Sequence, residues 1–286
     1  MTKSDNFKVS LPETFLFMKV LNKLYQYINI LSLDVVAGAV ISTLFFARVL
    51  HVTVSHYVLT ALALTVWIIY TIDHLRDARA IRNTALTDRH RFHQKHFKAI
   101  LTALIFVLVV DSALILFVPY RVLLFGLFLW SVVLAYLILQ RYLKFFKEFF
   151  VALLYTAGIL LPVFSSTTSN LEFIHFILIG KFFITALMNL LLFSLFDYKD
   201  DRHQKQHSFV TWFGPASTRL GILFLGLLNI SSGLFLWSFD PRVAMIFISM
   251  NLMLLAILFL KKQLVANNYY RILGDSVFFF PVFYLL

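Results

Sequence analysis

Long apolar blocks alternate with shorter polar segments along the whole chain. Each block is about 20 residues long, enough for a helix to cross a hydrocarbon layer about 30 Å thick. The pattern therefore predicts an all-α, polytopic membrane protein with about nine transmembrane helices. The predicted spans are residues 29–50, 55–73, 98–118, 121–141, 146–165, 174–196, 219–238, 242–260 and 269–286.

The composition supports a membrane location. Hydrophobic residues make up 60% of the 286 residues and charged residues 14%, whereas a soluble domain carries about 25% charged residues. The absence of cysteine excludes disulfides, thiolate metal sites and thiol nucleophiles. A net charge of +11 would favour nucleic-acid binding in a soluble protein, but an excess of Lys and Arg is also typical of cytoplasmic membrane-protein loops. We therefore expect a lipid bilayer around the chain and no nucleic-acid partner.

The cations are divided unevenly between the two sides of the predicted bundle. With a cytoplasmic N-terminus, 21 of the 25 Lys and Arg residues fall in cytoplasmic segments. Arg48, Arg121 and Arg242 fall on the other side, and Lys181 lies within a span near its outer end, where its ammonium group could snorkel to the surface. The positive-inside rule predicts a cytoplasmic N-terminus and an external C-terminus, and we expect the inner (plasma) membrane of a bacterium.

We expect a single transmembrane domain over residues 1–286. Residues 1–28 are polar and amphipathic and form a cytoplasmic N-terminal segment. Two connections, about residues 74–97 and 197–218, are long and polar, and both lie on the predicted cytoplasmic side. Long polar loops among short ones are usually functional, so the candidate site is expected there.

Aspartates stand where two of the apolar blocks end. Asp73 and Asp77 are four residues apart, and so are Asp197 and Asp201, with Asp200 between them. On a helix, residues at i and i+4 share a face, so each pair presents two carboxylates to one point. Mg²⁺ commonly binds one or two carboxylates together with substrate phosphates. The two pairs therefore favour a diphosphate held through Mg²⁺.

Basic residues near these aspartates fit the same ligand, because Arg and Lys bind phosphate oxygens. The alternative is a solvated rim in which the aspartates only form ion pairs with their basic neighbours. The occurrence of two pairs at matching helix ends favours the diphosphate site. The candidate diphosphate-binding cations are Arg76, Arg82, Lys147, Lys199 and Lys205.

In these motifs the chain resembles the UbiA superfamily of intramembrane prenyltransferases. That family has nine transmembrane helices and two Asp-rich motifs at the cytoplasmic ends of helices 2 and 6. The first family motif reads N-D-x-x-D-x-x-x-D. Asp73 and Asp77 occupy its last two Asp positions, Ile69 and Tyr70 replace its leading Asn-Asp, and Arg82 stands where the family often has Arg.

The second family motif, D-x-x-x-D, is matched by Asp197 and Asp201. Ser208 and Gly214 take the positions of the hydroxyl residue and the glycine that follow it. A family Lys after helix 4 precedes a helix-5 Gly by about eleven residues, and Lys147 and Gly158 have this spacing. The resemblance thus covers the topology of most of the chain, although about ten residues carry it.

The resemblance implies a prenyltransferase. Mg²⁺ held by Asp73, Asp77, Asp197 and Asp201 would bind a polyprenyl diphosphate, whose tail would lie among the helices. The allylic cation left by the departing diphosphate would be attacked by a hydrophobic acceptor. The acceptor class stays open between an aromatic quinone precursor, a porphyrin derivative and a lipid glycerol phosphate.

Other readings of the sequence remain open. The nine histidines could indicate a membrane di-iron hydroxylase or desaturase, since imidazole suits iron, although adjacent His-His pairs are missing. The lost Asn-Asp could instead indicate a family member that binds an isoprenoid without turnover. Asn189 lies eight residues before Asp197, about 12 Å deeper along a helix, and could face an acceptor or simply bond a neighbouring helix.

Overall fold

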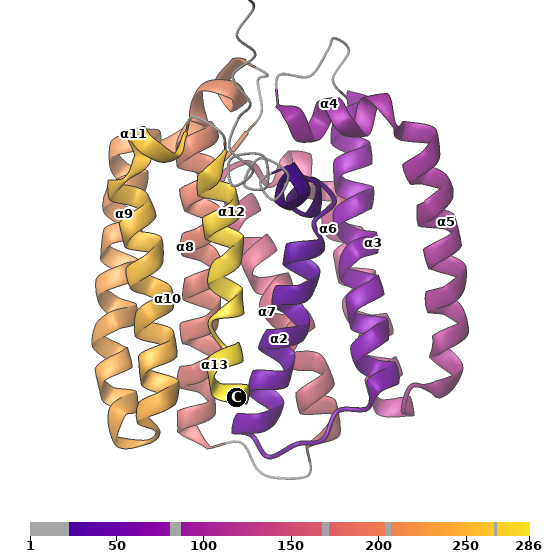
Figure 1. Cartoon of the computed structure of the whole chain (residues 1–286), viewed down its shortest axis with the longest axis vertical. Helices are drawn as coiled ribbons and strands as arrows, with labels where there is room; N and C mark the ends of the chain where they lie inside the picture. Colours follow the sequence, from indigo (N-terminus) through magenta and orange to yellow (C-terminus); the bar gives the residue numbers. More distant parts are fainter. Residues whose placement is uncertain (1–22, 81–86, 168–171, 204–206, 266–267) are drawn as a thin grey trace, which may run out of the picture.

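The computed structural model describes residues 23–80, 87–167, 172–203, 207–265 and 268–286. Within these ranges the regular structure is helical and no strand occurs, so the all-α prediction is confirmed. Figure 1 shows the helices side by side, most of them running between two ends of the molecule. The α-helices are α2 (Leu33–Val49), α3 (His56–Ala80), α4 (Asp88–Lys95), α5 (Phe97–Leu114), α6 (Tyr120–Leu139), α7 (Lys147–Ser166), α8 (Phe173–His203), α9 (Phe209–Phe235), α10 (Pro241–Phe259), α11 (Lys261–Leu264), α12 (Tyr269–Ser276) and α13 (Val282–Leu285).

Seven helices of the described chain are long and apolar enough to cross a membrane. An eighth span is a bent pair, Lys23–Ile30 with Leu33–Val49, whose axes differ by 72°. The ninth predicted span, 269–286, is broken into α12, a 3-10 turn at Val277–Phe279 and α13. Pro281 accounts for part of the break, because its ring would clash with the carbonyl four residues earlier in a continuous helix.

The two polar connections are shorter than predicted because the helices continue through them. α3 ends at Ala80 and α8 at His203, and α9 begins at Phe209, so the predicted loops 74–97 and 197–218 are largely helical. With 31 residues, α8 is about 46 Å long, which exceeds the hydrocarbon thickness. Its last turns can therefore carry charge outside the lipid, and both aspartate pairs lie on helix rather than in loops.

Gly214 divides α9 near its start. Its φ of 83° lies in the left-handed region that favours glycine, and Pro215 follows it within the helix. Residues 209–213 therefore form a separate first turn before the long part of α9. The predicted start at residue 219 missed this turn although four of its five residues are apolar, because Gly214 and Pro215 separate it from the longer apolar block.

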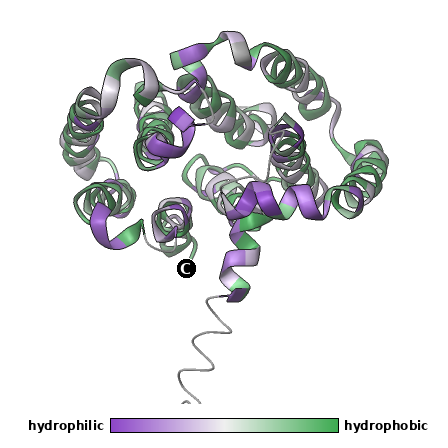
Figure 2. Cartoon of the chain, turned by 90° about the horizontal axis from the view of Figure 1, so that it is seen from above, coloured by the Kyte–Doolittle hydropathy of each residue, from purple (hydrophilic) through white to green (hydrophobic). Residues whose placement is uncertain are grey.

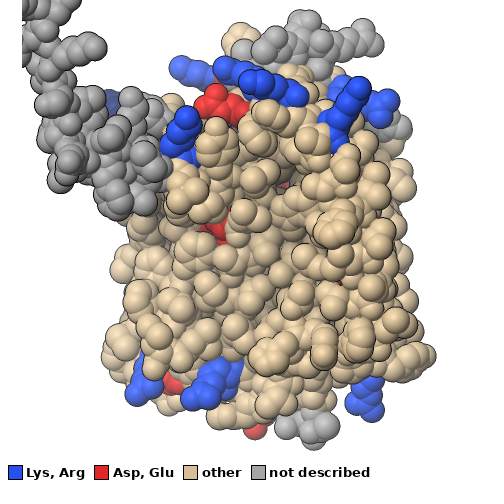
Figure 3. Space-filling model, turned by 45° about the vertical axis from the view of Figure 1, so that its right-hand side comes forward, with Lys and Arg blue, Asp and Glu red and all other residues tan. Residues whose placement is uncertain are grey.

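The outer surface and the interior differ as expected for a bundle in lipid. Figure 2 looks down on the helices standing around the centre. Aromatic side chains such as Phe46, Phe182 and Phe247 fill the buried core, whereas Phe106 and Phe128 on α5 and α6 are exposed. Figure 3 shows Lys and Arg at the two ends of one face and mainly uncharged residues between them. The chain is thus an integral membrane protein.

Lys181 is buried inside the bundle, so the prediction that it snorkels to the surface was wrong. Its side chain is 2% exposed. The ammonium group donates to Asn229 Oδ1 at 2.9 Å and Ser232 Oγ at 3.2 Å, and Asn229 Nδ2 in turn donates to Asn251 Oδ1 at 3.0 Å. This polar network joins α8, α9 and α10. It provides hydrogen-bond acceptors for the Lys181 ammonium group inside the bundle, so the side chain does not need to reach the surface.

Candidate active site

A cavity of about 730 Å³ enters the bundle at the end where α3 and α8 carry their aspartates. We call this end the carboxylate end. Helices α3, α4, α7, α8 and α12 line the cavity together with the short helix Lys23–Ile30. Five aspartates predicted from the sequence line this one cavity, namely Asp73, Asp77, Asp197, Asp200 and Asp201. The fold therefore brings together two motifs that lie more than a hundred residues apart.

The first pair is held by polar neighbours on its own side of the cavity. Gln140, in the turn after α6, donates from Nε2 to Asp73 Oδ1 at 3.0 Å. The guanidinium of Arg76 lies 3.5 Å from Asp73 and 3.6 Å from Asp77. Both aspartates are about one quarter exposed, so their carboxylates remain open to a ligand.

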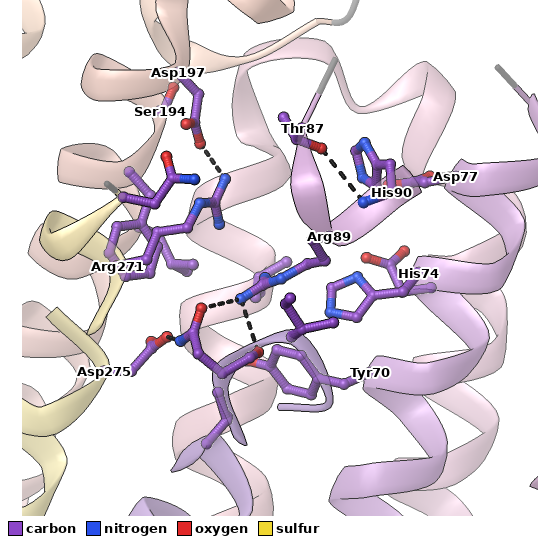
Figure 4. Close-up of a pocket in the computed structure, with 18 of the residues that line it drawn as sticks. Tyr70, His74, Asp77, Thr87, Arg89, His90, Ser194, Asp197, Arg271 and Asp275 are labelled. Carbon is purple, nitrogen blue, oxygen red and sulfur yellow. Dashed lines mark hydrogen bonds and ion pairs between the residues drawn. The ribbon is translucent and has the colours of Figure 1, made fainter. Parts of the chain in front are cut away.

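The second pair is connected to the last helices of the chain. Tyr270 donates its hydroxyl hydrogen to Asp197 Oδ1, and Arg271 forms an ion pair with Asp197 Oδ2. The Arg271 guanidinium lies over the ring of Phe193 at 5.4 Å. Figure 4 shows Arg271 reaching from α12 towards Asp197 on α8. Asp197 is therefore already neutralised by a cation from α12, a contact that the sequence motif alone does not predict.

The start of α7 lines the cavity beside the two helices that carry the aspartate pairs. Lys147 lines the cavity and interacts electrostatically with Asp73, Asp77 and Asp201. The neighbouring Glu148 accepts a hydrogen bond from the backbone nitrogen of Phe209 at 2.9 Å, which ties α7 to the start of α9. Lys147 thus lines the same cavity as both aspartate pairs and is close enough to interact with members of each.

The other predicted cations are placed differently. Arg76 and Lys199 are exposed and do not line the cavity among the residues described, although Arg76 reaches both aspartates of the first pair. Arg82 and Lys205 lie outside the described residues. Asn189, in contrast, is 3% exposed and lines the inner part of the cavity.

Helix α4 forms one wall of the entrance. Thr87 caps it by accepting from the backbone nitrogen of His90 at 3.4 Å. His93 is buried, with Nδ1 at 2.9 Å from the carbonyl oxygen of Arg89, and its ring packs against His74 of α3 at 5.2 Å. Burial, aided by nearby cations, lowers the pKa of His90 to about 4, and burial also lowers the pKa of His93. These histidines are neutral packing groups at physiological pH.

An inner cluster of polar groups was not predicted as part of the site. Asn29 donates from Nδ2 to Asp34 Oδ2 at 2.5 Å and to Asp275 Oδ2 at 3.1 Å. Arg89 of α4 donates to Asn29 Oδ1 at 3.0 Å. Figure 4 shows Arg89 and Asp275 approaching each other from different helices. The buried ionisable residues of a membrane span are a sequence signal for such a cluster, but the signal does not say which of them meet.

Comparison with known proteins identifies this architecture. No family model matches the sequence, and no curated protein matches it. A solved structure of a UbiA homolog from Archaeoglobus fulgidus, bound to DMAPP and Mg²⁺, matches with a TM-score of 0.60. The match covers 90% of this chain and 97% of that chain at 12% sequence identity. The fold is that of a UbiA homologue.

The UbiA fold raises the question of whether this chain's residues suit Mg²⁺. Among the residues described, no three His, Asp or Glu side chains converge as a metal-binding group. Instead, two carboxylate pairs face one cavity. Because Mg²⁺ commonly takes only one or two carboxylates and completes its coordination with phosphate and water, pairs of this kind fit a magnesium ion shared with a diphosphate.

The same geometry disfavours an iron site in this UbiA fold. His51 and His56 lie at the far end of α3 from His74. A separation of eighteen residues along that helix between His56 and His74 corresponds to about 27 Å. The histidines therefore do not gather as a di-iron centre requires within the described part of the chain.

Proposed function

We propose that the protein is a member of the UbiA superfamily and transfers a prenyl group from a polyprenyl diphosphate to a hydrophobic acceptor, with Mg²⁺ assistance. One observation carries the proposal. Two aspartate pairs from α3 and α8 line the same cavity of a membrane bundle. The solved UbiA homolog binds DMAPP and Mg²⁺, which is the ligand chemistry these carboxylates suit.

Different side chains would bind the metal ion and the phosphate oxygens of the diphosphate. Asp73 and Asp77 on one wall and Asp197 and Asp201 on the other would hold Mg²⁺, with Asp200 beside them. Lys147 lines the same cavity and would bind phosphate oxygens directly. Bound Mg²⁺ would stabilise the negative charge on the leaving diphosphate. Arg76 contacts Asp73 and Asp77 and would add positive charge beside the metal ligands, and Arg82, Lys199 and Lys205 remain predicted contributors.

The apolar part of the cavity would accept the start of the prenyl chain. Ile30, Val35, Val151 and Leu190 line it below the aspartates. An apolar lining that excludes water would protect an allylic cation from hydrolysis until the acceptor reacts. By the positive-inside rule the carboxylate end would face the cytoplasm of a bacterial cell.

A non-catalytic isoprenoid-binding protein is the second candidate. Ile69 and Tyr70 replace two metal-binding positions of the first family motif, and both line the cavity. Arg271 also forms an ion pair with Asp197, the first aspartate of the second motif. A protein of this kind would retain the diphosphate but leave it intact, so binding and turnover have to be measured separately.

The test is retention of a radiolabelled polyprenyl diphosphate by the detergent-solubilised protein, with Mg²⁺ and with EDTA. Retention should require Mg²⁺ and be lost in Asp201→Asn. Asp240→Asn is the matched control, because Asp240 caps α10 at the opposite end and Asn is also a good N-cap. Retention that is unchanged by EDTA and by the Asp201→Asn substitution would reject the proposal. Release of labelled prenyl product distinguishes the enzyme from the binding protein.

A further inference from the structure

A group of basic side chains lies at the carboxylate end but outside the cavity. Lys199 is near the end of α8, Arg219 is in α9, and Lys261 and Lys262 are in α11. Figure 1 shows α11 above α9 and α10, at the end of the molecule where α8 carries its aspartates. None of these four cations lines the cavity among the residues described. We call the four residues the basic patch.

Two cations of the basic patch are held in place by groups of neighbouring helices. Lys261 donates from Nζ to the carbonyl oxygen of Leu195 on α8 at 3.0 Å. Leu195 is one helical turn before Lys199, so Lys261 is fixed close to that residue. The guanidinium of Arg219 lies 5.8 Å over the ring of Phe259, two residues before Lys261. The patch is therefore a preorganised group of charges from three helices.

The cations of the basic patch form no ion pair within the part of the chain that the structure describes. The ion pairs found there belong to other residues, and Asp197, the acidic group nearest the patch on α8, is paired with Arg271. Burial, together with the charges of Lys199 and Arg219, lowers the pKa of Lys261, and Asp197 opposes the shift. Like charges held close together repel, so an anion from outside the chain would relieve this repulsion.

An exposed apolar surface continues from the basic patch along the helices. Leu220 follows Arg219 on α9, and Phe224 lies one turn deeper on the same helix. Both are exposed, as is Phe259 at the end of α10. The two helices pack closely, since a Cβ at Gly226 of α9 would lie 3.0 Å from a side-chain carbon of α10. Cations above an apolar, lipid-facing surface suit an anionic amphiphile, whereas a soluble anion would leave the apolar part unused.

We propose that the basic patch binds the phosphate of an anionic glycerophospholipid from the surrounding leaflet, and that the acyl chains lie along α9 and α10. Lys and Arg bind phosphate oxygens, and each cation near the membrane surface strengthens the binding of anionic lipid about fivefold. Because the patch lies outside the cavity, the phospholipid and the proposed diphosphate bind at separate places. The bound lipid connects the ends of α8, α9 and α11.

Native mass spectrometry of the detergent-solubilised full chain measures which lipid stays bound. The probes are phosphatidylglycerol and phosphatidylcholine with the same palmitoyl and oleoyl chains, the second having no net charge. The protein should retain phosphatidylglycerol about tenfold or more in preference to phosphatidylcholine. Equal retention of the two lipids would overturn the proposal. So would displacement of phosphatidylglycerol by glycerol phosphate at the same concentration, because the patch would then be a site for a free phosphate.

Paired substitutions locate the lipid on the molecule. Arg219→Gln combined with Lys261→Gln should reduce the preference for phosphatidylglycerol about tenfold or more. Arg79→Gln combined with Lys98→Gln is the matched control, because it removes one exposed Arg and one exposed Lys from the same end but outside the patch. Arg219→Lys combined with Lys261→Arg keeps both charges and should keep the preference, which separates the loss of charge from damage to the fold. An unchanged preference in the first pair, or an equal loss in the control pair, would reject the patch as the lipid site.

Discussion

At the scale of single residues, the ion pair of Asp197 with Arg271 is the contact that most affects the candidate site. Asp197 was predicted as a metal ligand from its spacing to Asp201, and the structure places it in the cavity. It also pairs Asp197 with Arg271 and Tyr270. Spacing within one helix predicts which carboxylates share a face, but not which distant cation reaches them, because that depends on how the last helix packs.

The ion pair between Arg271 and Asp197 predicts how tightly the site binds a divalent metal ion when no diphosphate is present. Arg271→Ala removes the positive charge beside Asp197, so Mn²⁺ used in place of Mg²⁺ should bind about fivefold more tightly without diphosphate. The factor is modest because Arg271 and Asp197 are 24% and 13% exposed, and solvent screens part of the Coulomb energy. Electron paramagnetic resonance of free Mn²⁺ measures the affinity.

Arg219→Ala serves as the control for this measurement. Arg219 lies over the ring of Phe259 and does not line the cavity among the residues described, so its loss should leave Mn²⁺ binding unchanged. Weaker Mn²⁺ binding in Arg271→Ala would show that the guanidinium orients Asp197 for the metal and does not compete with it.

At the scale of helices, the contact between α8 and α12 depends on one glycine. A Cβ at Gly274 would lie 2.5 Å from Asn189 Oδ1 and 2.6 Å from Phe193. Gly274→Ala should therefore displace α12 and destabilise the protein by about 1–3 kcal/mol, as overpacking of a close contact does. Thermal unfolding in detergent, followed by circular dichroism, measures the loss.

Gly221→Ala is the matched control for this helix contact. Gly221 lies within α9, and a Cβ there would meet no atom within 4 Å. Since Ala is a better helix former than Gly, Gly221→Ala should leave the unfolding temperature unchanged or raise it. Equal destabilisation by both substitutions would mean that the close approach at Gly274 is not the cause.

Helix α4 should loosen in acid because its histidines are held neutral. Burial lowers the pKa of His90 to about 4, assisted by Arg271, Arg89 and His93 and opposed by Asp73. Burial also lowers the pKa of His93. An unfolded histidine has a pKa near 6.5, so the unfolded helix binds more protons between these values. Docking of α4 is therefore complete above about pH 6.5 and weakens as the pH falls towards 4.

Hydrogen exchange of the α4 amides, corrected for intrinsic rates, measures this pH dependence. Protection should fall between about pH 6.5 and 4 in the unmodified protein. The double substitution of His90 and His93 by Gln should flatten the profile, whereas His96→Gln should preserve it, because His96 is exposed. A profile that stays level from pH 7 to 4 would contradict the predicted coupling.

At the scale of the whole molecule, hydrophobic patterning predicted most of the helical architecture but few of the contacts between the residues of the site. Long apolar blocks must become helices in lipid, since every backbone polar group needs an internal partner, and the all-helical bundle followed from that, whereas the likeness to UbiA came from the aspartate motifs. Hydrophobic patterning did not predict the break at Pro281 or the helical ends of α3 and α8. It marks which residues contact lipid, and it does not report the conformation of the backbone. The inner cluster of Asn29, Asp275 and Arg89 joins residues far apart in sequence, and only the packed structure brings them together.

The orientation in the membrane is the last prediction and follows from the whole charge pattern. The absence of cysteine makes single introduced cysteines unambiguous reporters. Arg121→Cys, at the start of α6 on the end opposite the aspartates, should react with a membrane-impermeant maleimide in spheroplasts. Lys199→Cys, exposed near the end of α8, should react only after the membrane is opened. The reverse pattern would place the carboxylate end outside the cell, where the diphosphate would have to be supplied from the periplasmic side.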